Sequence, residues 1–169
     1  MNLVFTGFMG TGKSQTGRIV SESLNKCFFD TDSLIEKEEG FSIDDIFLKY
    51  GEIYFRKIES KIIKKVSLKN SSVISCGGGV VLDSRNIVAL RKNGIIINLY
   101  ASAEVIYDRI VAKSDRPLLK CNDSLGEIKK LFAIRKNAYV NYDFAFNTDG
   151  LKAVEVADNI LNKLKLINI

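Results

Sequence analysis

Residues 7–14 read Gly7-Phe8-Met9-Gly10-Thr11-Gly12-Lys13-Ser14. Every fixed position of the phosphate-binding loop G-x-x-x-x-G-K-[ST] is present, between an apolar run at residues 3–5 and a helix-like stretch at residues 15–24. Because glycine has no Cβ atom, the backbone N–H groups of such a loop can surround phosphate oxygens, and the dipole of the following helix adds positive potential. The stretch predicts a nucleoside triphosphate site. The alternative is a glycine-rich turn that matches by chance.

Two side chains of this loop have defined roles in such a site. We expect Lys13 to neutralise the β- and γ-phosphates, which makes it a predicted catalytic residue. The Ser14 hydroxyl is expected to ligate the Mg²⁺ ion that accompanies a triphosphate. The residues of this part of the chain that we expect to bind ATP are Gly10, Thr11, Gly12, Lys13, Ser14 and Gln15.

The composition is that of an ordinary globular chain of one domain. The chain has 169 residues, of which 46% are hydrophobic and 27% charged, and no apolar run approaches the roughly 20 residues of a membrane span. A strand that the phosphate loop requires begins almost at Met1, so we expect no cleavable targeting peptide. The net charge of +5 is spread over helix-like stretches, which argues against a nucleic-acid partner.

The cysteine and histidine content limits the kinds of site and reaction that the chain can support. The three cysteines, Cys27, Cys76 and Cys121, are widely spaced without a C-x-x-C pattern, which argues against disulfides and zinc and favours a reducing cytoplasm. The chain has no histidine, so imidazole catalysis is excluded. The side chains that remain for proton transfer and for stabilising charge are carboxylates, lysines and arginines.

Five apolar runs alternate with helix-like stretches and predict strands at residues 3–5, 27–29, 73–76, 95–99 and 144–146. Alternating strands and helices predict a parallel sheet. The run at residues 95–97 is continuously apolar, as expected of a central strand covered on both faces. We therefore expect a single domain, residues 1–169, with the α/β fold of P-loop NTPases: a three-layer α/β/α sandwich on a five-stranded parallel sheet, with ligands beyond the carboxyl ends of the strands.

Two acids follow the second predicted strand. In an extended segment, Asp30 and Asp32 project to the same side, so both carboxylates can face one ligand. Beside a triphosphate, one acid can hold the Mg²⁺ shell and the other can accept a hydrogen bond from an attacking hydroxyl. The alternative is that Asp32 is only the N-cap of the next helix.

A predicted helix at residues 53–66 carries one charge inside its apolar stripe. Glu59 lies among the apolar positions, and a buried carboxylate needs a partner. Arg56, three residues earlier, can pair with it and keep donors for an anionic substrate, or the two can form a plain structural ion pair.

Glycines and arginines complete the candidate residues. Three glycines at residues 77–79 indicate that a ligand or a crossing helix presses against that backbone. A polar stretch at residues 113–124 contains Arg116. We expect it to be either a lid that closes over phosphates or an ordinary surface connection. Arg109, Arg116 and Arg135 add cations that could stabilise transition-state charge, and the alternative for each is a solvated position on a helix surface.

Together these residues resemble the shikimate kinase family over essentially the whole chain. The matching motifs are residues 7–14, Asp30-Thr31-Asp32, Phe55-Arg56-Lys57-Ile58-Glu59, Gly77-Gly78-Gly79, Arg116-Pro117-Leu118-Leu119, and Arg135 followed by Tyr139. The resemblance implies direct in-line transfer of the γ-phosphate of ATP to the 3-hydroxyl of shikimate, in the shikimate pathway of aromatic amino-acid biosynthesis. It also implies a cytoplasmic, Mg²⁺-dependent enzyme that is typically a monomer and whose partners are ATP and shikimate.

The resemblance also implies residue roles. It places a substrate-binding helical segment at about residues 32–62 and a lid at about residues 113–124. Asp30 belongs to the Mg²⁺ environment, Glu59 braces Arg56, Arg109 lies against adenine, and Arg116 reaches the phosphates as a catalytic residue beside Lys13 and Asp32. The residues that it implies for shikimate are Asp32, Arg56, Glu59, Gly78, Gly79 and Arg135.

The chain departs from the family pattern at two places, and two other functions compete. Residues 137 and 138 are Asn and Ala where the family usually has Pro and Leu, and residues 147–150 lack a basic residue that some relatives place near adenine. One rival is another small-molecule kinase of the same architecture, such as a gluconate or nucleoside monophosphate kinase. Arg56, Glu59 and the three glycines argue against it. The other rival is a nucleotide-dependent regulatory protein, for which the two acids would be unnecessary.

Overall fold

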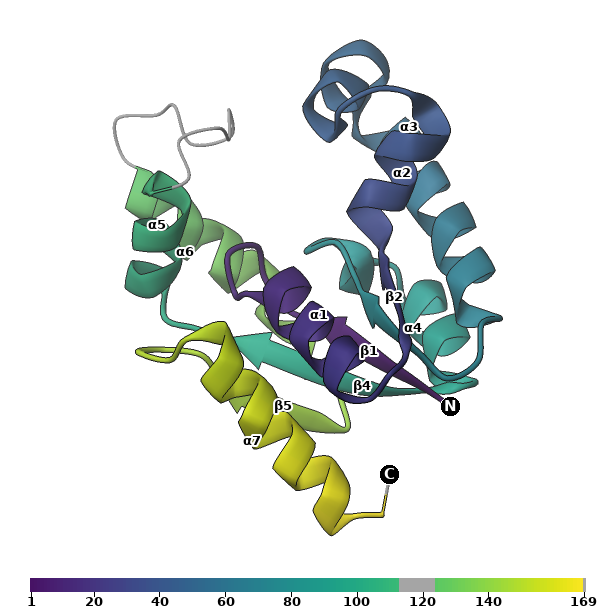
Figure 1. Ribbon diagram of the computed structural model, residues 1–169. Helices are drawn as coiled ribbons and strands as arrows, with labels where there is room; N and C mark the ends of the chain where they lie inside the picture. Colours follow the sequence, from purple (N-terminus) through teal and green to yellow (C-terminus); the bar gives the residue numbers. More distant parts are fainter. Residues whose placement is uncertain (113–123, 169) are drawn as a thin grey trace.

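The computed structural model describes residues 1–112 and 124–168. Its centre is a parallel sheet of five strands in the order β2-β3-β1-β4-β5 (Figure 1). The predicted fold class is confirmed, and each predicted strand lies within one or two residues of an observed strand. The strands are β1 (Asn2–Thr6), β2 (Cys27–Asp30), β3 (Ser72–Ser75), β4 (Gly94–Tyr100) and β5 (Phe144–Asn147).

Helices cover both faces of this sheet. One face packs against α1 and α7 through a core that includes Phe5, Ile97 and Val20, and the other packs against α2, α3 and α4. In β4, Ile96 belongs to one core and Ile97 to the other, as its continuous apolar run predicts for a central strand. The helices are α1 (Lys13–Ser23), α2 (Thr31–Glu39), α3 (Ile43–Ser67), α4 (Ser84–Arg91), α5 (Ala103–Val111), α6 (Ser124–Arg135) and α7 (Ala153–Leu166), with short 3-10 helices η1 (Val80–Leu82) and η3 (Lys136–Val140).

Helix α3 is longer than its apolar stripe predicts. It begins after Ser42, whose side chain accepts a hydrogen bond from the Asp45 N–H, and it kinks at Gly51, where φ is 77°. Before the kink the helix is mostly exposed, with Ile46 as the buried anchor. After the kink, Phe55, Ile58, Ile62 and Val66 are buried as predicted, with Ile63 and Glu59 beside them. Among the described residues, no helix is both long and apolar enough to cross a membrane.

A third, smaller core supports the phosphate loop. Phe8, at the start of the loop, is buried against Ile106 and Ile110 of α5 and Ile128 of α6. Its ring stacks on Phe132 with a centroid distance of 4.4 Å. The loop is therefore held from two sides, by the sheet behind it and by α5 and α6 beside it.

Candidate functional site

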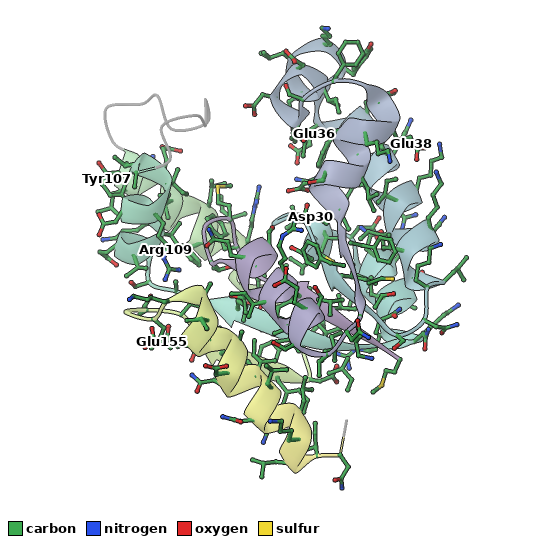
Figure 2. The ribbon with its side chains drawn as sticks, in the orientation of Figure 1. Asp30, Glu36, Glu38, Tyr107, Arg109 and Glu155 are labelled. Atoms are coloured by element: carbon green, nitrogen blue, oxygen red, sulfur yellow. The ribbon has the colours of Figure 1, made fainter. Side chains whose placement is uncertain are left out.

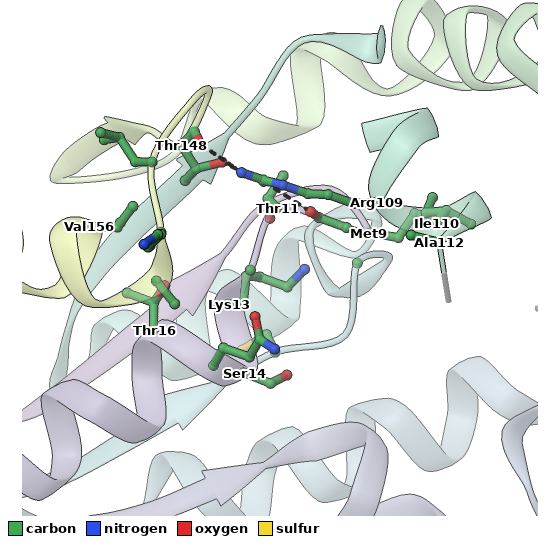
Figure 3. A pocket seen from close by; sticks show the side chains of 18 of the residues that line it. Met9, Thr11, Lys13, Ser14, Thr16, Arg109, Ile110, Ala112, Thr148 and Val156 are labelled. Atoms are coloured by element: carbon green, nitrogen blue, oxygen red, sulfur yellow. Dashed lines mark hydrogen bonds between the residues drawn. The ribbon is translucent and has the colours of Figure 1, made fainter. Parts of the chain in front are cut away.

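The phosphate loop joins β1 to α1 and opens into a cavity of about 500 Å³ (Figure 3). Gly12 has a φ of 88° directly before α1 begins at Lys13, so the N–H groups of the first helical turn face the loop. Gly7 has a φ of 138°, and a Cβ at this position would collide with the carbonyl of Leu99. The glycines of the motif thus serve both the backbone conformation and the contact with β4.

Lys13 lies in this cavity. Its ammonium donates to the Phe8 carbonyl at 2.8 Å, and the Thr11 hydroxyl donates to the same oxygen at 2.8 Å. The side chain is buried, so the charge lies in surroundings of low dielectric, where its effect on a bound phosphate is strong. Cys76 also lines the cavity, and burial raises the pKa of its thiol so that it stays neutral.

Ser14 meets Asp30 at the head of the loop. The Ser14 hydroxyl donates to Asp30 Oδ2 at 2.6 Å and lies 3.2 Å from the Ser75 hydroxyl. These three side chains offer only oxygen atoms, which is the donor set that Mg²⁺ prefers. Among the described residues, no group of three or more His, Cys, Asp or Glu side chains could hold a metal ion. Sequence analysis missed Ser75, although its position at the end of β3, paired with Asp30, was a usable signal.

The structure corrects the prediction for the two acids. Asp30 is the N-cap of α2, since its Oδ1 accepts from the N–H groups of Asp32 at 3.1 Å and Ser33 at 3.2 Å. Asp32 is therefore not the cap, and it is not in an extended segment, because α2 already begins at Thr31. The helical turn nevertheless carries the Asp32 carboxylate into the cavity that Lys13 lines. Figure 2 shows Asp30 where β2 passes into α2, across the start of α1 from Arg109.

The predicted pair of Arg56 and Glu59 is present. Arg56 Nη1 donates to Glu59 Oε2 at 2.8 Å, and Arg56 also bonds Glu52 on the exposed side. Burial alone would lower the pKa of Arg56, but the two carboxylates raise it above its ordinary value. Burial raises the pKa of Glu59, and the Arg56 charge counteracts this only in part. Glu59 Oε1 has no hydrogen-bond partner among the described residues.

Each of the three glycines has a different close neighbour. A Cβ at residue 77 would stand 2.5 Å from Asp32 Oδ1, and one at residue 78 would stand 3.1 Å from the Met9 nitrogen. A Cβ at residue 79 would run into the guanidinium of Arg56. The close approach predicted for this backbone comes from the side chains of Asp32 and Arg56, on α2 and α3, and from the backbone of the phosphate loop.

Arg135 is the last residue of α6, and Tyr139, four residues later, contacts one of these glycines. The Tyr139 hydroxyl donates to the Gly78 carbonyl at 2.5 Å. Burial raises the pKa of Tyr139, and the positive charge of Arg135 counteracts this in part. Arg116 and the predicted lid at residues 113–124 lie outside the described residues, apart from the first position of α6. Asp32 and Gly78 line the cavity, and Arg56, Glu59 and Gly79 lie beside them. Among the described residues, no hydrogen bond or ion pair joins Arg135 to this group.

Arg109 lines the other side of the cavity, beside the loop that follows β5. It donates to the Thr148 hydroxyl at 2.9 Å and to the Thr148 carbonyl at 2.6 Å, and it lies 3.3 Å from the Gly10 carbonyl (Figure 3). The cavity continues past it along Leu151, Lys152 and Val156. Residues 147–150 lack a basic side chain, but Lys152 places one on this side of the cavity. Sequence analysis missed Thr148 and Lys152, because only the position of β5 beside β4 brings them to the cavity.

A family model for shikimate kinase matches residues 9–165. This chain belongs to the shikimate kinase family. The shikimate kinase of Caldicellulosiruptor saccharolyticus is 49% identical over 161 residues, covering 95% of this chain and 94% of the relative. That of Thermodesulfovibrio yellowstonii is 41% identical over 167 residues, covering 99% of this chain and 96% of the relative.

Solved structures of the shikimate kinase family superpose on most of the chain. The shikimate kinase from Acinetobacter baumannii in complex with shikimate has a TM-score of 0.92 and 32% identity, covering 99% of this chain and 93% of that one. The Aquifex aeolicus enzyme has a TM-score of 0.84 and 37% identity, covering 98% and 96%. A gluconokinase from Sinorhizobium meliloti, at 15% identity, a TM-score of 0.63 and coverage of 98% and 92%, shares the fold alone.

Proposed function

We propose that this chain transfers the γ-phosphoryl group of ATP to the 3-hydroxyl of shikimate, as a step of aromatic amino-acid biosynthesis. The observation that supports this most is the shared cavity, in which Lys13 and Asp32 face the same space and the Arg56–Glu59 pair lies against the adjoining glycines. Membership of the shikimate kinase family agrees with this arrangement.

The proposed roles follow from where the side chains lie. Lys13 binds the β- and γ-phosphates, and the Asp32 carboxylate accepts a hydrogen bond from the attacking hydroxyl and orients it in line. Arg56 and Arg135 hold the carboxylate of shikimate through charge-assisted hydrogen bonds, and Glu59 keeps Arg56 in place. Arg109 lies against the adenine. Arg116, outside the described residues, is proposed to reach the transferring phosphoryl from the lid.

The oxygens of Ser14 and Asp30 are proposed to hold Mg²⁺ together with the triphosphate. When bound, the ion neutralises charge on the β- and γ-phosphate oxygens. The Ser14 hydroxyl, now donating to Asp30, can turn a lone pair toward the cavity, while Asp30 Oδ1 stays occupied as the cap of α2. We further propose a cytoplasmic monomer of one domain, residues 1–169, whose partners are its two substrates, with a substrate-binding segment at about residues 32–62.

An ADP-release assay tests the reaction. With ATP and shikimate, we expect ADP to form together with a 3-phosphate ester that phosphorus NMR identifies. With ATP and gluconate, or with ATP alone, release should fall to background. Equal release with gluconate would favour another small-molecule kinase. Nucleotide binding without acceptor-dependent release would favour a regulatory protein.

Removal of the metal provides a separate test. Excess EDTA is expected to lower the shikimate-dependent rate by at least about 100-fold, because charge on the phosphates then lacks a neutralising partner. Addition of Mg²⁺ beyond the chelator should restore the rate. If the rate in EDTA equals the rate with Mg²⁺, the proposal that Ser14 and Asp30 hold Mg²⁺ is wrong. The proposed role of Lys13 would be unaffected by that result.

A further inference from the structure

Arg56 is held between two carboxylates of its own helix, and the two differ in how firmly they are fixed. Glu59 Oε2 accepts from Nη1 at 2.8 Å, and the Glu59 side chain is 2% exposed. Glu52 Oε1 accepts from Nε at 3.2 Å and from Nη2 at 3.0 Å, but the Glu52 side chain is 59% exposed. A buried carboxylate leaves its partner only at a large cost, whereas water or another anion can replace an exposed one at little cost.

Glu52 occupies one of the two-nitrogen edges of the Arg56 guanidinium. At such an edge, Nε and Nη2 together bind a carboxylate through two parallel hydrogen bonds. Glu52 directly follows Gly51, where α3 kinks, and lies one helical turn before Arg56, so it reaches this edge from within the same helix. A carboxylate that binds Arg56 at this edge must therefore displace Glu52.

The charges around Arg56 also oppose an arriving carboxylate. When both acids are ionised, the carboxylates of Glu52 and Glu59 outnumber the single guanidinium between them. The Asp32 carboxylate lies close by, since a Cβ at Gly77 would approach both Asp32 and Glu59. Removal of the charge on Glu52 alone would leave the buried Arg56–Glu59 pair electrically balanced.

We propose that Glu52 is an internal competitor for the carboxylate of the substrate: it holds the Nε–Nη2 edge of Arg56 until shikimate displaces it, and so lowers the affinity of the site. The inference rests on the proposed function. Because Glu52 and Glu59 already hold the guanidinium, the exchange costs little side-chain freedom. The phosphorylated product keeps the same carboxylate, so the same competition favours its release.

The Glu52→Gln variant removes the charge and keeps the shape of the side chain. We expect the shikimate Kd, measured by calorimetry without nucleotide, to fall about fivefold, which is the upper range of what an exposed ion pair contributes. The KM for ATP and Tm should stay within about twofold and 2 °C of the wild type. A substitution that merely disturbed the structure would weaken binding instead. Glu104→Gln is the matched control, since Glu104 is 60% exposed, pairs with Lys129 and does not line the cavity.

A double-variant cycle with Arg56→Lys tests whether Glu52 acts through the Arg56 edge. Lysine keeps the positive charge beside Glu59 but lacks that edge, so Glu52→Gln should then change the shikimate Kd by less than about twofold. An unchanged or raised Kd in Glu52→Gln, or an equal fivefold gain in the Arg56→Lys background, would overturn the proposal. If the wild type binds shikimate but does not phosphorylate it, the proposed function fails while the calorimetric comparison still decides the role of Glu52. A wild type that does not bind shikimate overturns both.

Discussion

Replacement of Lys13 by methionine is expected to lower kcat by about 1000-fold, because the variant removes a buried cation from the place where phosphoryl charge develops. The KM for ATP should change much less, since the backbone N–H groups of the loop still bind the phosphates. The fold should persist, because methionine has a similar length and the Phe8 carbonyl keeps its second donor, the Thr11 hydroxyl. Single-turnover phosphoryl transfer with saturating shikimate measures the effect.

Lys165→Met is the matched control for this variant. Lys165 is exposed in the last turn of α7 and does not line the cavity, so its replacement removes one positive charge without touching the site. The control should retain the wild-type kcat. A Lys13→Met enzyme with kcat within about tenfold of the wild type would contradict the assigned role of the phosphate loop.

The Arg56→Ala variant is expected to raise the shikimate KM about 100-fold and to leave ATP binding nearly unchanged. Two hydrogen bonds between a guanidinium and a carboxylate are together worth about 3 kcal/mol, and each 1.4 kcal/mol corresponds to tenfold in affinity. The side chain lies against Gly79 and does not line the cavity that Lys13 and Arg109 share, so its loss should leave ATP binding unaffected. Separate saturation curves for shikimate and ATP provide the measurement.

The Arg56→Ala substitution is expected to affect both protein stability and shikimate binding, so the two effects need separate measurements. Loss of Arg56 leaves the Glu59 carboxylate buried without its partner, which is expected to lower the free energy of unfolding by about 3 kcal/mol. The double variant Arg56→Ala with Glu59→Gln removes the buried charge, so it should regain stability but not shikimate affinity. Lys57→Ala, at the exposed neighbouring position, should change neither the stability nor the shikimate affinity. Equal rises in the KM values of both substrates would contradict the proposal that Arg56 binds shikimate.

Most of the architecture could be predicted from local pattern. The phosphate loop, the five apolar runs and the charge at Glu59 inside an apolar stripe are all set by neighbours within a few residues, as is the i,i+3 pairing with Arg56. Two local predictions were wrong: the start of α3, and the conformation at Asp30 and Asp32. Their spacing is compatible with either an extended strand or a helical turn, and the two hydrogen bonds that make Asp30 the cap decided between them.

The sequence by itself determined the fold class, the phosphate loop and which residue types could take part in the chemistry. Only the tertiary structure decided how these meet. It brings close neighbours to each glycine at residues 77–79, and it places Ser75 beside Ser14, Arg109 on Thr148 and the Tyr139 hydroxyl on the Gly78 carbonyl. These contacts join residues that are far apart in the chain. They depend on β3 lying between β2 and β1 and on β5 lying beside β4, and strand order leaves no trace in local periodicity.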